Sequence, residues 1–283
     1  MNRRPSARQA LEDLIKKFRE FLLIDLRRNP KTAYEHVYYV RKFLSRLNKP
    51  LNMINAEDVR EYLRTLNGSS SSVYKNTLGA LKLFLRDFLG KPQAVQSFKF
   101  PRQQFKPKRI LGKEDLKRFY ECLESSQEKA LFLLYGASGL RRNEILSLKP
   151  EDVDFNTHMI TPNNHNGETK KSWLSFYNQE AENVLREYLN NKKTTRSKRI
   201  FSMPRIEERR LWKIVREKTG LNVTPQRLRE WFCCEMASLS VSDRYIDAFC
   251  GRTPKSVLAK NYTEYSPEKL KQIYEKANLK VLA

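Results

Sequence analysis

The chain has 283 residues, which is long enough for two domains that each bury a core. It carries 55 Lys and Arg against 32 Asp and Glu, a net charge of +23 that predicts a polyanionic partner. Apolar residues at 40% and aromatic residues at 11% exclude a disordered basic tail. The longest apolar run, "ALFLLYGA", is too short to span a bilayer, so we expect no membrane partner and a cytoplasmic location.

The cysteines and histidines do not form a metal-binding pattern. None of the four cysteines has CxxC spacing, and the three histidines are scattered. We therefore expect no zinc site and no cofactor. Cys233 and Cys234 are interpreted as helix residues in a reducing compartment.

The first hundred residues are predicted to form four helices. One apolar stripe, at alternating steps of four and three, comprises Ala33, Val37, Val40, Leu44 and Leu47. A second stripe comprises Tyr74, Leu78, Leu81, Leu85 and Phe88. Gly90 stands where this second helix would end. Asn55 is the expected N-cap of a helix over "AEDVREYLRTL", and a further helix is expected within residues 6–27.

Basic residues lie off the second stripe and along a segment that contains prolines. Those off the stripe are Lys75, Lys82 and Arg86. They are candidates for phosphate contacts, or alternatively a solvated helix face. From Gln96 to Lys113 there are two prolines and no acidic residue, which predicts an extended basic linker over 96–112. Its candidate DNA contacts are Lys99, Arg102, Lys106, Lys108 and Arg109; the alternative is a hinge with incidental charge.

The second half is predicted to combine helices with a small antiparallel sheet. Helices are expected over "LGKEDLKRFYECL", "QEKALFLLYGASGL", "NQEAENVLREYL" and most of the chain from residue 207 onward. A strand pair is expected around "HMIT" and "KSWLSF". The predicted fold class is therefore mainly α, with a helical domain over 1–95 and an α+β domain over 113–283.

Two fragments of this second domain contain candidate site residues. "SGLRRNEILSL" places Arg141 at a helix start with Glu144 three residues on, a spacing that is also common in local ion pairs. "GETKKSWLSF" places Lys170 and Lys171 near a hairpin tip, where charged residues are common. Neither fragment alone is specific.

Two later fragments complete the pattern. "VTPQRLREWF" places Gln226 and Arg229 on one face of a helix that begins near Pro225. "FCGRTPKSVLAKNYTEYSPEKL" contains Arg252 and, ten residues later, Tyr262. Without the arginines, Tyr262 would be interpreted as a helix tyrosine that packs in the core.

Taken in order, the four fragments resemble the tyrosine recombinase (integrase) family. The family's Gly-Leu-Arg-x-x-Glu segment matches 139–144, its Thr-Pro-x-x-Leu-Arg segment matches 224–229, and its Tyr-Thr step matches 262–263. Four family histidines are replaced, by Gln226, Glu230, Arg252 and Glu264. These departures and the C-terminal stretch look most like the integrases of archaeal viruses and plasmids.

The resemblance implies a role for each matching residue. Arg141 and Arg229 would clamp the scissile phosphate, with Arg252 as a third cation. Tyr262 would be the nucleophile, although Tyr265 and Tyr274 are rivals. Lys170, or its neighbour Lys171, would protonate the leaving oxygen. Gln226 could orient the phosphate but could not act as a general base near neutral pH.

The same resemblance implies a site-specific recombinase that cuts and rejoins double-stranded DNA through a 3′-phosphotyrosyl intermediate. The helical front half is similar to the family's core-binding domain. The family works as a tetramer that exchanges C-terminal helices, here "PEKLKQIYEKANLKVL"; packing of this helix in cis is the alternative. Two other functions stay open: a type IB-like topoisomerase, and a DNA-binding relative with weak or no catalysis.

Overall fold

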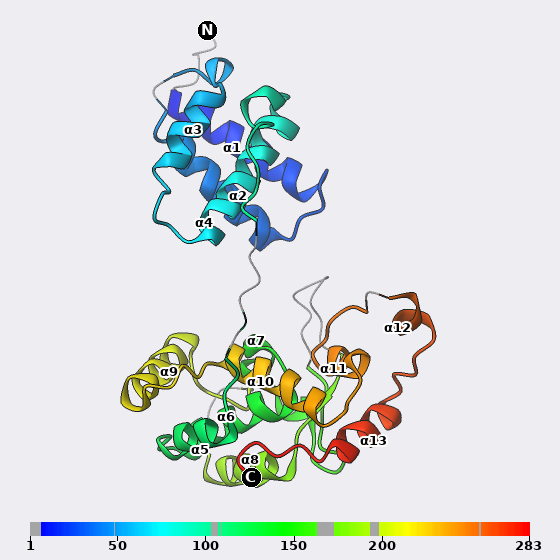
Figure 1. The fold of residues 1–283 in the computed structure, drawn as a ribbon. Coiled ribbons are helices and arrows are strands. Elements are labelled where there is room, and N and C mark those ends of the chain that lie inside the picture. Colours follow the sequence, from blue (N-terminus) through cyan, green and yellow to red (C-terminus); the bar gives the residue numbers. More distant parts are fainter. Residues whose placement is uncertain are drawn as a thin grey trace. The chain divides into compact units, whose positions relative to one another are not determined.

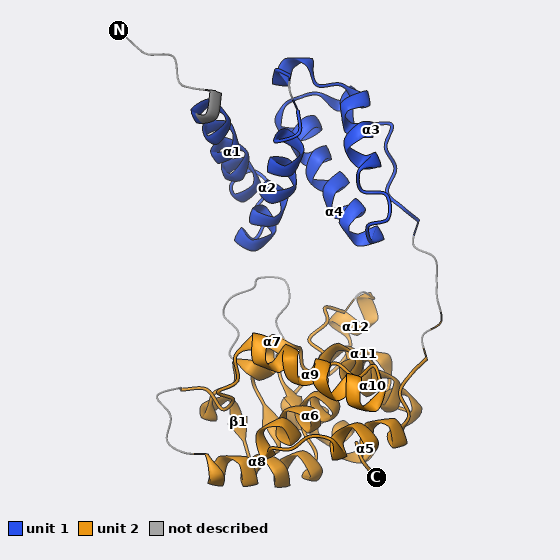
Figure 2. Ribbon diagram, turned by 90° about the vertical axis from the view of Figure 1, so that its left-hand side faces the viewer, with its two compact units in different colours: residues 1–106 blue, residues 107–283 orange. Residues whose placement is uncertain are grey.

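A computed structural model describes residues 7–47, 49–102, 107, 109–162, 173–192, 198–254 and 256–283. The chain forms two compact units, residues 1–106 and 107–283 (Figure 2). Helices dominate both units, and a small antiparallel sheet lies in the second (Figure 1). The predicted fold class is confirmed.

Unit 1 is a helical bundle whose core is formed by the predicted stripes. Its α-helices are α1 (Ala7–Leu23), α2 (Pro30–Leu44), α3 (Ala56–Arg64) and α4 (Ser71–Leu81), and its short 3₁₀ turns are η1 (Leu51–Met53) and η3 (Pro92–Ala94). The residues of both stripes are buried or half-buried. Asn55 caps α3 as predicted, because its side chain accepts hydrogen bonds from the amides of Glu57 and Asp58.

The second predicted stripe does not form one continuous α-helix. After α4 the chain continues as a π-helical segment, η2 (Lys82–Phe88), in which the amide of Leu89 donates to the carbonyl of Phe84. The rings of Phe84 and Phe88 both contact Phe18 of α1, with centroid distances of 5.1 and 5.4 Å. Gly90, with φ of 66°, follows the segment.

The first residues of the predicted linker contact unit 1. The ring of Phe98 lies 5.7 Å from the guanidinium of Arg60, and the ring of Phe100 lies 5.2 Å from the ammonium of Lys82. Both contacts place a cation near an aromatic ring, an arrangement that attracts the two groups. The chain thus stays attached to unit 1 for several residues beyond 95, where the prediction ended the first domain.

Unit 2 is built around a buried helix. Its helices are α5 (Lys113–Glu121), α6 (Ser126–Ser138), α7 (Arg142–Leu146), η4 (Pro150–Asp152), α8 (Gln179–Asn191), α9 (Arg205–Thr219), α10 (Pro225–Ser238), α11 (Asp243–Phe249), α12 (Val257–Asn261) and α13 (Pro267–Ala277). Every residue of α6 from Ala130 to Ser138 is buried. A helix that is apolar all round needs partners on every side, and α6 packs against α8 and α10 (Figure 1).

The sheet confirms the predicted strand pair and adds a third strand. The strands β1 (Val153–Asp154), β2 (Met159–Ile160) and β3 (Ser175–Phe176) are antiparallel in the order β1-β2-β3. Met159 lies opposite Phe176, and Ile160 opposite Ser175. The predicted hairpin tip at 163–172 falls outside the described residues.

The C-terminal helix α13 packs on its own chain. Leu270 and Ala277 are buried, and the hydroxyl of Tyr274 donates to the carbonyl of Ala137 at 2.8 Å. Val281, beyond the helix, is also buried, and its side chain packs against Gly136 of α6. In this single chain α13 therefore packs in cis, that is, against unit 2 of the same chain rather than a neighbouring subunit. Among the described residues, no helix is both long and apolar enough to cross a bilayer.

Candidate active site

Arg141 is positioned by a sharp turn between two helices. Gly139 ends α6 with a φ of 62°, and Arg141 then precedes the first residue of α7. The buried carboxylate of Glu144 accepts from the backbone amide of Arg141 at 2.6 Å and from its Nη1 at 2.9 Å. The three-residue spacing seen in the sequence therefore orients the guanidinium of Arg141.

Arg229 lies in the buried face of α10, where it is only 6% exposed. Its Nη1 donates to the carbonyl of Gly139, and its Nη2 donates to the carbonyl of Cys250 at 2.6 Å. Burial lowers the pKa of Arg229 below its ordinary value. An arginine stays protonated even so, because its ordinary pKa lies above 12.

The two arginines meet at one turn of the chain. Arg141 Nη2 donates to the carbonyl of Gly251 at 3.0 Å, one residue after the carbonyl that Arg229 binds. Segments about 90 residues apart in sequence thus bring two guanidinium groups to adjacent peptide carbonyls. The side chains of Arg141 and Arg229 therefore lie at one turn, and not in unrelated pockets.

Arg252 joins the same turn and adds a third cation. Its Nη1 binds Asp247 at 2.9 Å, and its Nη2 lies 3.4 Å from the sulfur of Cys233. Burial tends to lower the pKa of Arg252, but the bond to Asp247 and the nearby thiols raise it above its ordinary value. Arg252 also lines a surface hollow together with residues of α11 and α12.

Among the described residues, Tyr262 makes no hydrogen bond to Arg141, Arg229 or Arg252. It follows the last residue of α12 and is 75% exposed. Within the described part of the chain, no hydrogen bond or ion pair joins its phenol to another residue. Tyr265, its rival, is half-buried and donates to the carbonyl of Ala259 at 2.7 Å. The phenol of Tyr262 is therefore exposed to solvent, whereas that of Tyr265 is bonded to the backbone of α12.

The remaining predicted catalytic residues are placed only in part. Gln226 is exposed in the first turn of α10, three residues before Arg229. Lys170 and Lys171 fall in 163–172, outside the described residues. Among those that are described, no three His, Cys, Asp or Glu side chains gather as a metal site would require.

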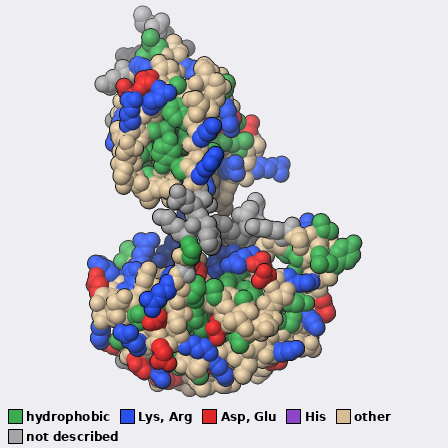
Figure 3. Space-filling view, in the orientation of Figure 1, with side chains coloured by type: hydrophobic (Ala, Val, Ile, Leu, Met, Phe, Trp, Pro, Cys, Tyr) green, Lys and Arg blue, Asp and Glu red, His purple; other side chains and the backbone are tan. Residues whose placement is uncertain are grey.

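The predicted DNA contacts are mainly surface cations. Five are exposed: Lys75, Arg86, Lys99, Arg102 and Arg109. Arg86 is paired with Asp87 at 2.7 Å, and Lys82 is half-buried over Phe100. Lys106 and Lys108 are not among the described residues. Figure 3 shows lysine and arginine side chains on both units, interspersed with fewer acidic ones.

Sequence reasoning missed the groups that hold the arginines. These are the carbonyls of Gly139, Cys250 and Gly251, the carboxylate of Asp247 and the thiol of Cys233. Backbone carbonyls carry no sequence signal. Cys233 did offer one, because it follows Arg229 by four residues and so shares its helix face.

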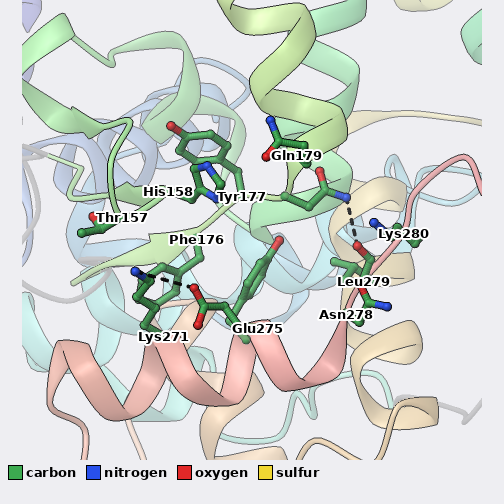
Figure 4. A pocket seen from close by; sticks show the side chains of 12 residues that line it. Thr157, His158, Phe176, Tyr177, Gln179, Lys271, Glu275, Asn278, Leu279 and Lys280 are labelled. Carbon is green, nitrogen blue, oxygen red and sulfur yellow. Dashed lines mark hydrogen bonds and ion pairs between the residues drawn. The ribbon is translucent and has the colours of Figure 1, made fainter.

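A separate hollow lies between the sheet and α13 (Figure 4). Tyr177 and His158 line it from the sheet side, and Lys271 and Glu275 line it from α13. The amide of Asn178 binds the carbonyl of Leu279 at 3.0 Å and so ties the segment after α13 to the start of α8. None of the three arginines lines this hollow, and its contacts hold the C-terminal helix in place.

Comparisons with known proteins identify the family of this chain. The sequence profile of the phage integrase family matches residues 109–269, and that of the phage integrase N-terminal SAM-like domain matches residues 14–94. The chain belongs to the phage integrase family. It is thus a tyrosine recombinase, an enzyme that transfers DNA strands.

Two curated relatives span nearly the whole chain. Tyrosine recombinase XerA of Pyrococcus horikoshii is 25% identical, with 94% of each chain covered. Tyrosine recombinase XerA of Thermococcus kodakarensis is 26% identical, with 94% of this chain and 96% of the relative covered. Both are named as recombinases and not as topoisomerases, so the topoisomerase alternative is not favoured.

Solved structures of low sequence identity show the same fold. The Tn1549 transposon integrase in complex with circular intermediate DNA has a TM-score of 0.70 at 14% identity and covers 92% of this chain and 98% of that one. A lambda integrase tetramer bound to a Holliday junction has a TM-score of 0.68 at 12% identity, covering 94% and 84%.

Proposed function

We propose that this recombinase breaks a DNA phosphodiester by attack of Tyr262 on a phosphorus held by Arg141 and Arg229. The observation that carries the proposal is the convergence of these two guanidinium groups on the Cys250–Gly251 turn. A guanidinium has five N–H donors, and the two carbonyl bonds of Arg229 use two of them. The contacts thus orient Arg229 and leave donors for phosphate oxygens.

The clamp lowers the barrier by neutralising charge. The negative charge of a phosphodiester repels nucleophiles, and the transition state carries more charge than the ground state. Two arginines, with Arg252 as a third cation, stabilise that extra charge. They also favour the phenolate form of Tyr262, because a neutral phenol is a poor nucleophile.

The products of this step are a 3′-phosphotyrosyl linkage and a free 5′-hydroxyl. Lys170 is our candidate donor of the proton that the leaving oxygen needs, and Gln226 our candidate for orienting the phosphate. The linkage keeps the energy of the broken bond, so a second strand can be joined without ATP. Tyr262 reaches the clamp by movement of the segment that carries α12.

The partner in this proposal is double-stranded DNA that carries attachment sites. A basic linker and the cations of unit 1 would contact its phosphates. We further propose a tetramer on two duplexes, acting in the cytoplasm to integrate or excise a mobile element of the archaeal virus or plasmid type. Exchange of α13 between neighbouring subunits would replace its cis packing in that assembly.

The test is covalent capture on a nicked duplex. The duplex is first selected for binding from a randomised library and then nicked near its centre, so that the cleaved end is lost and the adduct is trapped. We expect wild type and Tyr265→Phe to give a covalent protein–DNA product. Tyr262→Phe should give none, because no hydroxyl remains to attack. Capture by Tyr262→Phe would overturn the assignment of the nucleophile.

A further inference from the structure

Two thiols lie beside the arginine clamp, and the proposed reaction does not use them. Cys233 lies on α10, four residues after Arg229, and Cys250 follows the last residue of α11. Both are free cysteines, and their sulfur atoms are 3.4 Å apart. A disulfide has an S–S length of about 2.05 Å, so a shift of roughly 1.3 Å would join them.

The surroundings give the two thiols different chemistry. A hydrogen bond with Cys250 lowers the pKa of Cys233 despite burial, and the charges of Arg252 and Arg229 act in the same direction. The hydrogen bond with Cys233, together with burial, raises the pKa of Cys250. Cys233 therefore ionises more readily than Cys250, and it is partly exposed, whereas Cys250 is fully buried. The thiolate is the form that reacts with oxidants.

We propose that Cys233 and Cys250 form a redox switch, in which a hydroperoxide converts them to a disulfide that stops DNA cleavage. The switch regulates the site described above, so its effect on activity rests on the proposed function of Arg141 and Arg229. The disulfide itself does not depend on that function.

The oxidation proceeds in two balanced steps. The thiolate of Cys233 attacks one peroxide oxygen; an S–O bond forms, the O–O bond breaks, and the departing oxygen takes a proton. Cys250 then attacks the sulfenic acid; the S–S bond forms, the S–O bond breaks, and hydroxide leaves as water with the thiol proton. The two cysteines lose two electrons in total, which the peroxide gains. Loss of the Cys233 thiolate also removes the hydrogen bond and the charge that help to raise the pKa of Cys250.

The new bond would disturb the clamp through the backbone. The carbonyl of Cys250 accepts from Arg229, and the next carbonyl accepts from Arg141. Drawing the two sulfurs together moves the Cys250–Gly251 turn that orients both guanidinium groups. A misplacement of about 1 Å can lower the rate of an enzyme on the order of 100-fold.

The first test detects the disulfide itself. The full chain is treated with hydrogen peroxide, free thiols are blocked, and the peptides are mapped by mass spectrometry. We expect a Cys233–Cys250 linked peptide that disappears in Cys233→Ser and in Cys250→Ser. The matched control is Cys234→Ser, which changes the next residue of α10 and should keep the link. A wild-type protein without this linked peptide would overturn the proposal.

The second test measures covalent capture on the nicked duplex, each sample being compared with its own reduced form. Oxidised wild type and oxidised Cys234→Ser should lose capture on the order of 100-fold and regain it with dithiothreitol. Oxidised Cys233→Ser should keep the capture of its reduced form. Unchanged capture by the disulfide-linked protein would contradict the switch. If the reduced protein captures no DNA, the proposed function fails instead, while the linked peptide still decides whether the disulfide forms.

The pH dependence of alkylation provides a third, independent measurement. Because the pKa of Cys233 is lowered and that of Cys234 is raised, mainly by burial, the thiolate of Cys233 persists to lower pH. The rate of iodoacetamide labelling at Cys233 should therefore level off at a lower pH than the rate at Cys234. Equal profiles for the two cysteines would show that Cys233 is not activated.

Discussion

Gly139 combines a positive φ with close packing against Phe232, and both favour a residue without a side chain. Its φ of 62° turns the chain from α6 toward Arg141, and its carbonyl accepts from Arg229. A Cβ at this position would lie 2.4 Å from Cδ1 of Phe232, closer than real atoms approach. The absence of a side chain therefore allows both the turn and the close packing against α10.

We expect Gly139→Ala to destabilise the protein more than Gly220→Ala. Both glycines have positive φ, which costs a residue with a Cβ about 1–2 kcal/mol, but Gly220 has open space where its Cβ would stand. The extra loss in Gly139→Ala measures the clash with Phe232. Urea unfolding midpoints of the two variants give the comparison. Equal losses would mean that Phe232 moves aside without cost.

Residue-level prediction from the sequence depends on side chains that carry a recognisable pattern. The family resemblance predicted that Arg141 and Arg229 share a site, and both guanidinium groups donate to carbonyls of the Cys250–Gly251 turn. The ion pair of Asp247 with Arg252 could not be predicted. The two residues are five positions apart, and only the turn after α11 brings their side chains together. Local turn geometry of this kind leaves no periodic pattern.

Helix α7 depends on tertiary contacts for its existence. It has only five residues, far fewer than an isolated helix needs in water. Arg142 is the first residue of α7, and its side chain forms an ion pair with Glu208 of α9. The Glu208 side chain is fully buried. The same carboxylate accepts from the hydroxyl of Tyr135 at 2.8 Å and from the indole of Trp212 at 3.1 Å. Glu208 thus ties α7 to α6 and α9.

We expect Glu208→Ala to lower the free energy of unfolding by about 3–5 kcal/mol, because the variant leaves a cation and two buried donors without their acceptor. Glu207→Ala, at the exposed neighbouring position, should change it by less than about 0.5 kcal/mol. Chemical denaturation of both variants measures the difference. A loss below about 0.5 kcal/mol in Glu208→Ala, the range of surface substitutions, would show that this network does not stabilise the fold.

Elements were predictable in proportion to their length and periodicity. The stripes of α2 and α4 span several turns, so the 3.6-residue repeat identified them. The π-helical segment after α4 and the strand β1 were not predicted. All three strands have only two residues and so no measurable alternation; β2 and β3 were predicted because the Asn- and Gly-rich "PNNHNGETK" lies between them. A π-helical segment keeps apolar residues at nearly helical intervals.

Across both units, the excess of positive charge predicts binding that depends strongly on salt. A protein that neutralises about six phosphates loses roughly 10³-fold in affinity between 50 and 200 mM salt. We expect binding of the full chain to duplex DNA to fall at least this steeply. Binding titrations at several salt concentrations measure the slope of log affinity against log salt. A flat slope would contradict the phosphate-contact role of the surface cations.

A pair of matched variants tests which surface contributes to the salt dependence of DNA binding. Lys75 is exposed on α4 and belongs to the predicted DNA face, whereas Lys213 is exposed on α9 and pairs with Glu217 at 3.6 Å. Lys75→Gln should reduce the slope by about 1, as loss of one phosphate contact does. Lys213→Gln should leave it unchanged. The reverse result would move the DNA-binding face to α9.

The amino-acid order alone was enough to establish the helical class, the basic character and the order of the arginine and tyrosine segments, since charge and periodicity are local properties of the chain. The meeting of Arg141 and Arg229 at the Cys250–Gly251 turn was decided by folding. The acceptors there are backbone carbonyls, which every residue possesses, so only the packing of α6, α10 and α11 selects the ones that serve. The same packing places the sulfurs of Cys233 and Cys250 within 3.4 Å, a proximity that two cysteines 17 positions apart in the sequence do not reveal.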